Sequence, residues 1–175
     1  MTDEPISDLT HIQRSTQAQE EENLAFRAFV KLELELSDRR LNAIVQETTE
    51  QVWAGIDCRT CANCCKTRHP LFRRTEVERI AVYLGTTVEN LRRRYLEPSE
   101  EGTYTTRQLP CPFLEQNLCS IYPVRPAVCA SYPHLQQNFR SRLWQVLDNA
   151  EICPIVYNVL ARLKTRCGFR GSAPP

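Results

Sequence analysis

The chain has 175 residues, a formal net charge of +1 and nine cysteines. This length is enough to bury a hydrophobic core, so a bound metal would add to a packed fold. The near-neutral charge argues against wholesale electrostatic attraction to nucleic acid, and no apolar run approaches the roughly 18 residues of a membrane span, so we expect no membrane partner.

The N-terminal segment differs in composition from the rest of the chain. Residues 1–22 carry six acidic side chains against one arginine and show no apolar periodicity. This composition predicts a disordered acidic tail at 1–22, a folded domain at 23–167 and a flexible tail at 168–175. The segment lacks the basic region and apolar stretch of a secretory signal, so the expected compartment is the cytoplasm.

Two helices are predicted before the first cysteine. Apolar residues recur at helical spacing between Ala25 and Leu36, although part of this run also alternates as in a strand, and we favour helix. Ser37 or Asp38 can cap a second helix, which Gly55 ends.

Two further helices follow the first cysteines. Thr75–Glu78 has the pattern of a capping box and predicts a helix to Leu84. Thr86–Glu89 repeats the pattern and predicts a short helix through Tyr95. Two helices joined by a short turn can bind DNA, but packing is the commoner role of this motif.

The second half of the chain is predicted to be loop-rich. Alternating side chains indicate a short strand over 103–109, and five prolines between 110 and 133 leave room for one helical turn at 125–129. A last helix is expected from Pro154 to just before Gly168. The predicted fold is a small single domain, mainly α with short β segments and long loops, organised around a cysteine metal site.

Eight cysteines fall into two groups, one within residues 58–65 and one spread over 111–153. Thiolates are soft ligands for zinc, copper(I) and iron–sulfur clusters, so this pattern indicates a metal site. A disulfide framework is the alternative, but nine is an odd number and a reducing compartment keeps thiols free. The predicted metal ligands are Cys58, Cys61, Cys64, Cys65, Cys111, Cys119, Cys129 and Cys153.

The spacing within the first group suggests how these thiols are shared. Cys58 and Cys61 can direct two sulfurs at one metal, and sulfurs of the second group must complete the shell. Cys64 and Cys65 point apart in an extended chain, so one of them is expected to serve a second site or to bridge. Two four-thiolate zinc sites and a ferredoxin-type iron–sulfur cluster both fit, and Cys167 is left outside.

Other side chains near the cysteines are candidates for the same site. His69 and His134 could each replace a cysteine as ligand, although a surface histidine is the commoner outcome. Arg125 could donate hydrogen bonds to a thiolate or offset its charge, with a surface cation as the alternative. Tyr122 and Phe113 are expected to pack over the site as core residues.

The stretch from residue 59 to residue 95 carries nine basic side chains against three acidic ones. It could face nucleic acid or another acidic partner. We favour a solvated face beside anionic cysteines, because no aromatic residues are interleaved as stacking platforms.

Four motifs then follow one another at fixed spacings: Cys58-x-x-Cys61-x-x-Cys64-Cys65, Cys111-Pro-Phe-Leu114, Cys119-Ser-Ile-Tyr-Pro-Val-Arg-Pro126 and Cys129-Ala-Ser-Tyr-Pro133. Together they resemble the YkgJ-type cysteine-cluster family over about residues 55–154. That family is named for its CxxCxxCC core, and the resemblance implies chelation of zinc or iron. Ala130 stands where such proteins often have arginine.

The same domain resembles part of the flagellin lysine-N-methylase family. The five glycines form no Gly-rich nucleotide loop, so the resemblance does not carry that activity over. The sequence therefore predicts a metal-binding protein with a structural, carrier or electron-transfer role. The alternatives are a redox or modification enzyme that uses the cluster, and a metal-stapled interaction module with a protein partner. Whether the chain is an enzyme stays open, because no hydrolytic residue pattern is present.

Overall fold

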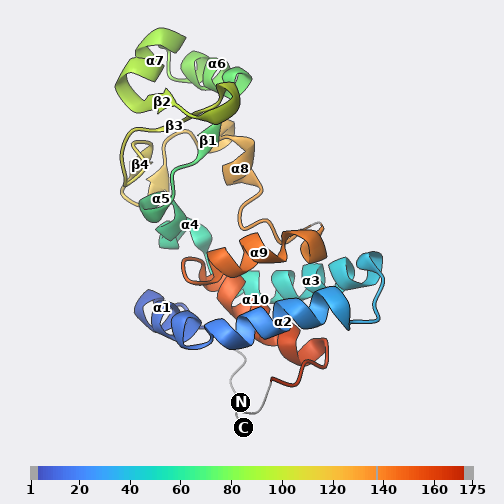
Figure 1. Cartoon of the computed structure of the whole chain (residues 1–175). Coiled ribbons are helices and arrows are strands. Elements are labelled where there is room, and N and C mark those ends of the chain that lie inside the picture. The colour runs from blue at the N-terminus through green and yellow to red at the C-terminus, as the bar shows by residue number, and fades with distance from the viewer. Residues whose placement is uncertain (1–3, 137, 172–175) are drawn as a thin grey trace. The chain divides into compact units, whose positions relative to one another are not determined.

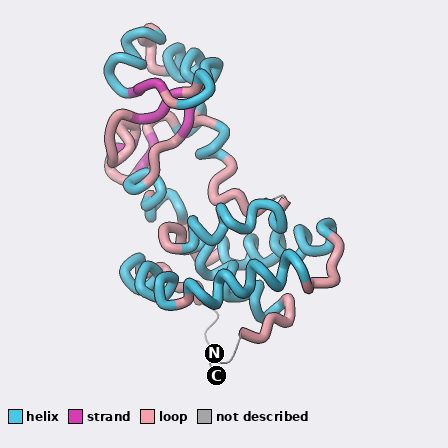
Figure 2. Tube along the Cα trace, viewed as in Figure 1, coloured by secondary structure: helices cyan, strands magenta, loops and turns pink. Residues whose placement is uncertain are grey.

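The computed structural model describes residues 4–136 and 138–171, and the chain divides into two compact units (Figure 1). We call Met1–Asp57 with Pro133–Pro175 the helical unit, and Cys58–Tyr132 the cysteine unit. Within the described residues, all strands belong to the cysteine unit (Figure 2). The predicted class, mainly α with short β segments, is confirmed. The boundaries proposed for a domain at 23–167 stay a prediction.

The helical unit is a bundle whose helices each bury one apolar stripe. Helix α10 packs against α3 and α9, and α2 packs against α9. None of the helices in the described part of the chain is long and apolar enough to cross a membrane. The elements of the unit are α1 (Leu9–Ala18), α2 (Glu20–Leu32), α3 (Asp38–Trp53), α9 (Phe139–Ala150) and α10 (Pro154–Arg166).

Several helix boundaries in this unit follow the predicted signals. The Ser37 hydroxyl oxygen accepts the N–H of Arg40 at 3.3 Å and caps α3. Pro154 stands in the first turn of α10, where its missing N–H costs nothing. No helix was expected at α9, although the buried residues Phe139, Leu143 and Val146 recur at helical spacing.

The N-terminal segment is a correction. Residues 9–18 were expected to be disordered, but they form α1, while residues 1–3 lie outside the described part of the chain. The Asp8 carboxylate accepts the N–H of His11 at 2.6 Å, Ile12 is fully buried, and the Gln17 amide donates to Glu151 Oε1 at 2.7 Å. Tertiary contacts with α2, α9 and α10 therefore stabilise a segment whose composition alone suggests disorder.

The C-terminal tail predicted at 168–175 lies partly outside the described residues, which end at 171. In its described part, the Phe169 ring packs against Phe26 and Phe29, with ring centroids 5.3 and 5.5 Å apart. These contacts attach the segment after α10 to α2 through apolar burial.

The cysteine unit combines short helices with two small antiparallel sheets. One sheet has the strand order β1–β3–β2, and the other is the β4–β5 hairpin. The predicted strand over 103–109 is shortened to β3. The elements are α4 (Cys58–Cys61), α5 (Asn63–Thr67), β1 (Leu71–Phe72), α6 (Arg74–Tyr83), α7 (Val88–Tyr95), β2 (Leu96–Pro98), η1 (Glu100–Gly102), β3 (Tyr104–Thr106), β4 (Leu114–Glu115), β5 (Leu118–Cys119), η2 (Tyr122–Val124) and α8 (Ala127–Ala130).

A hydrophobic core inside this unit carries two of the cysteines. It includes the fully or almost fully buried Phe72, Leu91 and Phe113, and Cys111 and Cys119 pack against it. The rings of Phe72 and Phe113 meet at 6.1 Å, at an interplanar angle of 61°. Cys111 and Cys119 thus lie against a packed hydrophobic core that includes these two aromatic rings.

The starts of α6 and α7 lie close to their predicted positions. Thr87 caps α7 by accepting the N–H of Asn90 at 3.1 Å, one residue beyond the predicted Thr86. Helix α6 begins at Arg74, and the acid that reaches back to the first amides is Glu76 rather than Glu78. The predicted capping box was therefore wrong by two residues.

We predict that Asn158 attaches the N-terminal segment to α10. Its Oδ1 accepts the N–H of Ile6 at 2.9 Å, and its Nδ2 donates to the Ile6 carbonyl at 2.7 Å. Asn158→Ala should lower the free energy of unfolding by about 1–3 kcal/mol, because two half-buried hydrogen bonds to the Ile6 backbone are lost, each worth about 0.5–1.5 kcal/mol. Hydrogen exchange should accelerate at Ile6, whereas the exposed Thr165→Ala on the same helix should leave it unchanged. Equal exchange in both variants would contradict this attachment.

Candidate metal centre

The first four cysteines lie on two consecutive helical turns. Cys58 and Cys61 stand three residues apart on α4, which places them on one face. Ala62 follows in the left-handed conformation, with φ of 48°, and is buried. This conformation costs an alanine roughly 1–2 kcal/mol. It separates α4 from α5, which carries Cys64 and Cys65.

The expectation that Cys64 and Cys65 point apart in an extended chain is wrong, because both lie on the helical turn α5. The Cys64 side chain hydrogen-bonds to the Cys65 sulfur. This bond, assisted by the positive charge of Lys66, lowers the pKa of Cys65 to about 7 despite partial burial. Cys65 is therefore readily ionised near neutral pH.

A backbone hydrogen bond connects Cys111, of the second group, to the turn that carries Cys64 and Cys65. The N–H of Cys111 donates to the carbonyl of Cys65 at 2.8 Å. Cys119 ends β5, after a two-residue turn at Gln116 and Asn117 whose φ values are 50° and 64°. Positive φ at both positions matches the twist of a tight hairpin. Helix α4 lies against β5, so the two cysteine groups adjoin in two places.

Backbone amides point at the sulfurs of this hairpin. The Cys111 sulfur accepts the N–H of Phe113, and the Cys119 sulfur accepts the N–H of Ile121. In both cases the donor follows its cysteine by two residues. Hydrogen bonds to sulfur favour the thiolate, which is the form that binds metal.

Four sulfurs are close enough to affect one another's ionisation. Burial raises the pKa of Cys111 to about 11 and that of Cys129 to about 12, and it also raises the pKa of Cys119. In each case repulsion from neighbouring thiolates adds to the increase, with Cys65 acting on all three. Negative charge at Cys65, Cys111, Cys119 and Cys129 is therefore mutually unfavourable unless a cation compensates it.

One arginine supplies part of that compensation. The positive charge of Arg125 opposes the increase in the pKa values of Cys119 and Cys129. Its guanidinium lies 3.7 Å from the centroid of the Tyr122 ring and donates to the Tyr122 carbonyl at 3.0 Å. Phe113 is buried as predicted, but Tyr122 is 45% exposed, so its predicted core role is wrong. Its ring instead forms a surface for Arg125.

Glu76 holds the turn that carries Cys129, a role that the sequence reasoning missed. Its buried carboxylate accepts the N–H of Arg73 and the N–H of Ala127, both at 2.8 Å. The Arg79 guanidinium donates to the carbonyls of Val124 and Arg125 at 3.3 and 3.2 Å. Side chains of α6 thus form hydrogen bonds with two backbone carbonyls and one backbone N–H of residues 124–127. The only sequence signal was an acid in the first turn of a helix.

The remaining candidates lie in different surroundings. His69 Nδ1 lies 2.8 Å from the Thr106 carbonyl oxygen and 2.9 Å from the Thr106 hydroxyl oxygen. His134 belongs to the helical unit, and its pKa is lowered by burial and by Arg142. Cys153 and Cys167 also belong to the helical unit, at the two ends of α10. The other seven cysteines belong to the cysteine unit.

Comparison with known families gives one match. Residues 57–154 match the family described as "CxxCxxCC: Putative zinc- or iron-chelating domain". The chain belongs to this family. The resemblance stated from the motifs is therefore confirmed, and Cys167 lies outside the matched span. No curated protein and no solved structure matches the chain.

The donor set fits the chemistry in the CxxCxxCC description. No disulfide joins any of the cysteines in the described part of the chain, and thiolates favour zinc and iron–sulfur clusters over magnesium or calcium. Among the residues that the structure describes, no three His, Cys, Asp or Glu side chains already stand at ligating distances. Metal binding by these sulfurs would therefore involve side-chain rotation toward a common centre.

We predict that Glu76 is needed for the stability of the turn at Cys129. Glu76→Ala removes the acceptor of two backbone amides and should lower the free energy of unfolding by about 2–4 kcal/mol. The matched control is Glu78→Ala on the same helix, where an exposed pair with Arg74 is lost; it should cost about 0.5 kcal/mol or less. Urea unfolding measures both. Similar losses in the two variants would contradict the role given to Glu76.

Proposed function

We propose that the cysteine unit binds zinc or an iron–sulfur cluster through its thiolates. The observation that supports this most strongly is that Cys65 raises the pKa of Cys111, Cys119 and Cys129 through repulsion. Thiols from three separate segments therefore lie near one another, although they do not yet stand at ligating distances. Burying several negative charges together is costly unless a cation neutralises them. A divalent zinc ion or a cluster would remove this repulsion and join the segments.

We assign Cys65, Cys111, Cys119 and Cys129 to one set of ligands. Cys58, Cys61 and Cys64 provide three further thiols on the adjoining turns, and we assign them to a second set or to a shared cluster. This grouping combines one sulfur of the first group with three sulfurs of the second. Cys153 stays a predicted ligand, which the metal measurement below includes.

We propose that the metal has a structural, carrier or electron-transfer role. The spectrum and metal content of anaerobically purified protein decide between the two chemistries. Thiolate-ligated iron–sulfur clusters absorb visible light, whereas zinc, with a filled d shell, gives colourless protein. Neither zinc nor iron in protein from a metal-supplemented preparation would contradict the proposed function.

We predict that single Cys→Ser changes at positions 65, 111, 119 and 129 each weaken metal affinity by more than about tenfold, because each removes one thiolate from a shared shell. Cys167→Ser is the matched control and should bind metal as the unchanged chain does. Chelator competition measures the affinities. Cys153→Ser belongs in the same series, and an affinity equal to that of Cys167→Ser would remove Cys153 from the ligands. Unchanged affinity at all four positions would contradict the assigned set.

We predict that metal binding releases protons and tightens as pH rises. The pKa of about 11 at Cys111 and of about 12 at Cys129 keeps both thiols protonated near neutral pH in the metal-free chain. Since metal binds the thiolate, about two protons should leave from these positions. Calorimetry in two buffers with different ionisation enthalpies counts the protons released. A binding enthalpy independent of the buffer would show that metal binding releases no protons from these thiols, which would contradict the prediction.

A further inference from the structure

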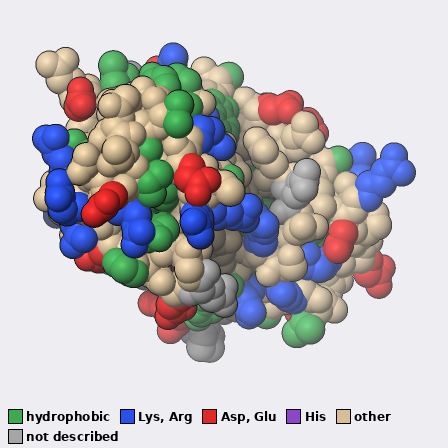
Figure 3. All heavy atoms as spheres, turned by 90° about the horizontal axis from the view of Figure 1, so that it is seen from above, with side chains coloured by type: hydrophobic (Ala, Val, Ile, Leu, Met, Phe, Trp, Pro, Cys, Tyr) green, Lys and Arg blue, Asp and Glu red, His purple; other side chains and the backbone are tan. Residues whose placement is uncertain are grey.

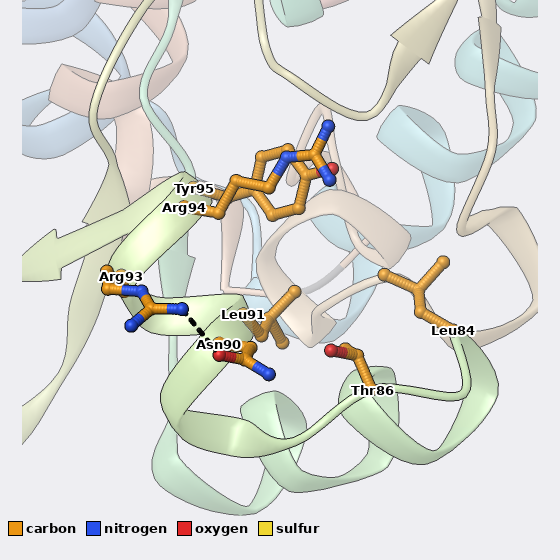
Figure 4. Close-up of a pocket in the computed structure, with 7 residues that line it drawn as sticks. All are labelled: Leu84, Thr86, Asn90, Leu91, Arg93, Arg94 and Tyr95. Carbon is orange, nitrogen blue, oxygen red and sulfur yellow. Dashed lines mark hydrogen bonds between the residues drawn. The ribbon is translucent and has the colours of Figure 1, made fainter.

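The α6–α7 hairpin carries a hollow of about 620 Å³ that has no cysteine in its lining. Figure 4 shows Leu84 and Thr86 on one side of this space, and Leu91, Arg94 and Tyr95 on the other. We call this hollow the α6–α7 groove. It lies within one unit, and all its lining residues fall between 84 and 95.

Apolar side chains are unusually exposed next to the groove. Val82, Tyr83 and Leu84 end α6 in succession and are 82%, 48% and 39% exposed. Of these three residues, Leu84 lines the groove, and an exposed apolar side chain beside a hollow is a candidate contact for a partner. The groove is floored by Leu91, which is only 1% exposed and belongs to the core of the unit.

The rim of the groove is basic. Arg93 donates to Asn90 Oδ1 at 2.8 Å, and the Arg94 guanidinium lies 5.0 Å from the centroid of the Tyr95 ring. Among the described residues, neither guanidinium forms an ion pair with a carboxylate, and the groove lining contains no acid. Figure 3 shows blue basic side chains beside green hydrophobic ones on the face seen from above. The groove therefore combines apolar contact area with uncompensated positive charge.

The hairpin holds these side chains in place before any ligand arrives. Thr87 caps α7, Leu91 is anchored in the core, and the Arg92 guanidinium lies 4.5 Å from the centroid of the Tyr104 ring on β3. Side chains on a fixed helix lose less freedom on binding than side chains on a loop. The groove thus has the rigidity of a preformed binding surface.

We propose that the α6–α7 groove binds an acidic segment of a partner protein that carries an apolar anchor residue. The carboxylates would face Arg93 and Arg94, while the anchor would contact Leu84 in the groove lining. A nucleic acid fits less well, because its phosphates would leave the apolar half exposed and Tyr95 is already covered by Arg94. The proposal needs no metal and goes beyond the function proposed above.

The test is a selection from a displayed library of random 16-residue peptides on the full-length chain. Counter-selection uses the double variant Arg93→Glu/Arg94→Glu, and the matched control is Arg73→Glu/Arg74→Glu, which makes the same charge change at the exposed start of α6. The selected peptides should combine Asp or Glu with Leu, Ile or Phe. Fluorescence anisotropy should show binding to the unchanged chain and to the control. Binding to Arg93→Glu/Arg94→Glu should be weaker by at least about tenfold.

Two further probes separate the components of the surface. Leu84→Ser should also weaken binding of the selected peptide by about tenfold, because the apolar anchor loses its contact in the groove. A peptide of equal charge with serine at the apolar positions should bind more weakly than the selected peptide. Selection without acidic and apolar enrichment, or equal loss in the two arginine variants, would overturn the proposal. So would tighter binding of a DNA duplex of equal charge.

Discussion

Burial of several ionisable sulfurs in one small region is the constraint on which the cysteine unit depends. Protonation relieves the repulsion between them at the expense of ligand strength, and a cation relieves it by binding the anionic form. With pKa values of about 11 at Cys111 and about 12 at Cys129, both thiols stay protonated near neutral pH when no cation is bound. The N–H groups of Phe113 and Ile121 and the charge of Arg125 oppose that outcome without reversing it. In the proposed function, metal binding would therefore displace protons from Cys111 and Cys129.

Three local features of the backbone position the cysteine segments, and each lies in a different part of the chain. Ala62 turns the chain between α4 and α5, and the hairpin turn at 116–117 brings Cys119 back opposite Leu114. Glu76 fixes the start of the α8 turn from a separate helix. The left-handed Ala62 is strained, and strain of this kind persists where surrounding contacts require a particular geometry. The surrounding contacts therefore set the cysteine positions before any metal contributes.

Local sequence signals were sufficient to predict many of the helix starts and to identify the cysteine motifs. Ser37, Thr87 and Pro154 mark helix starts through bonds or ring constraints within a few residues, which sequence can predict to within one residue. Helix α1 and the role of Glu76 depend on partners far along the chain. The pattern of apolar residues in the sequence does not indicate such contacts, so neither feature could be predicted. The expected divergence of Cys64 and Cys65 failed for a related reason, because it assumed an extended chain where a helical turn forms.

The basic stretch between residues 59 and 95 divides into two parts once its contacts are known. Lys66 lowers the pKa of Cys65 and so acts on the cysteines, as the favoured interpretation of this stretch required. The arginines of α7 instead contact Asn90, Tyr95 and Tyr104. Compensation of thiolate charge therefore accounts for only part of the positive charge here. The charge of Arg93 and Arg94 is explained more simply by a carboxylate-bearing partner than by the cysteines.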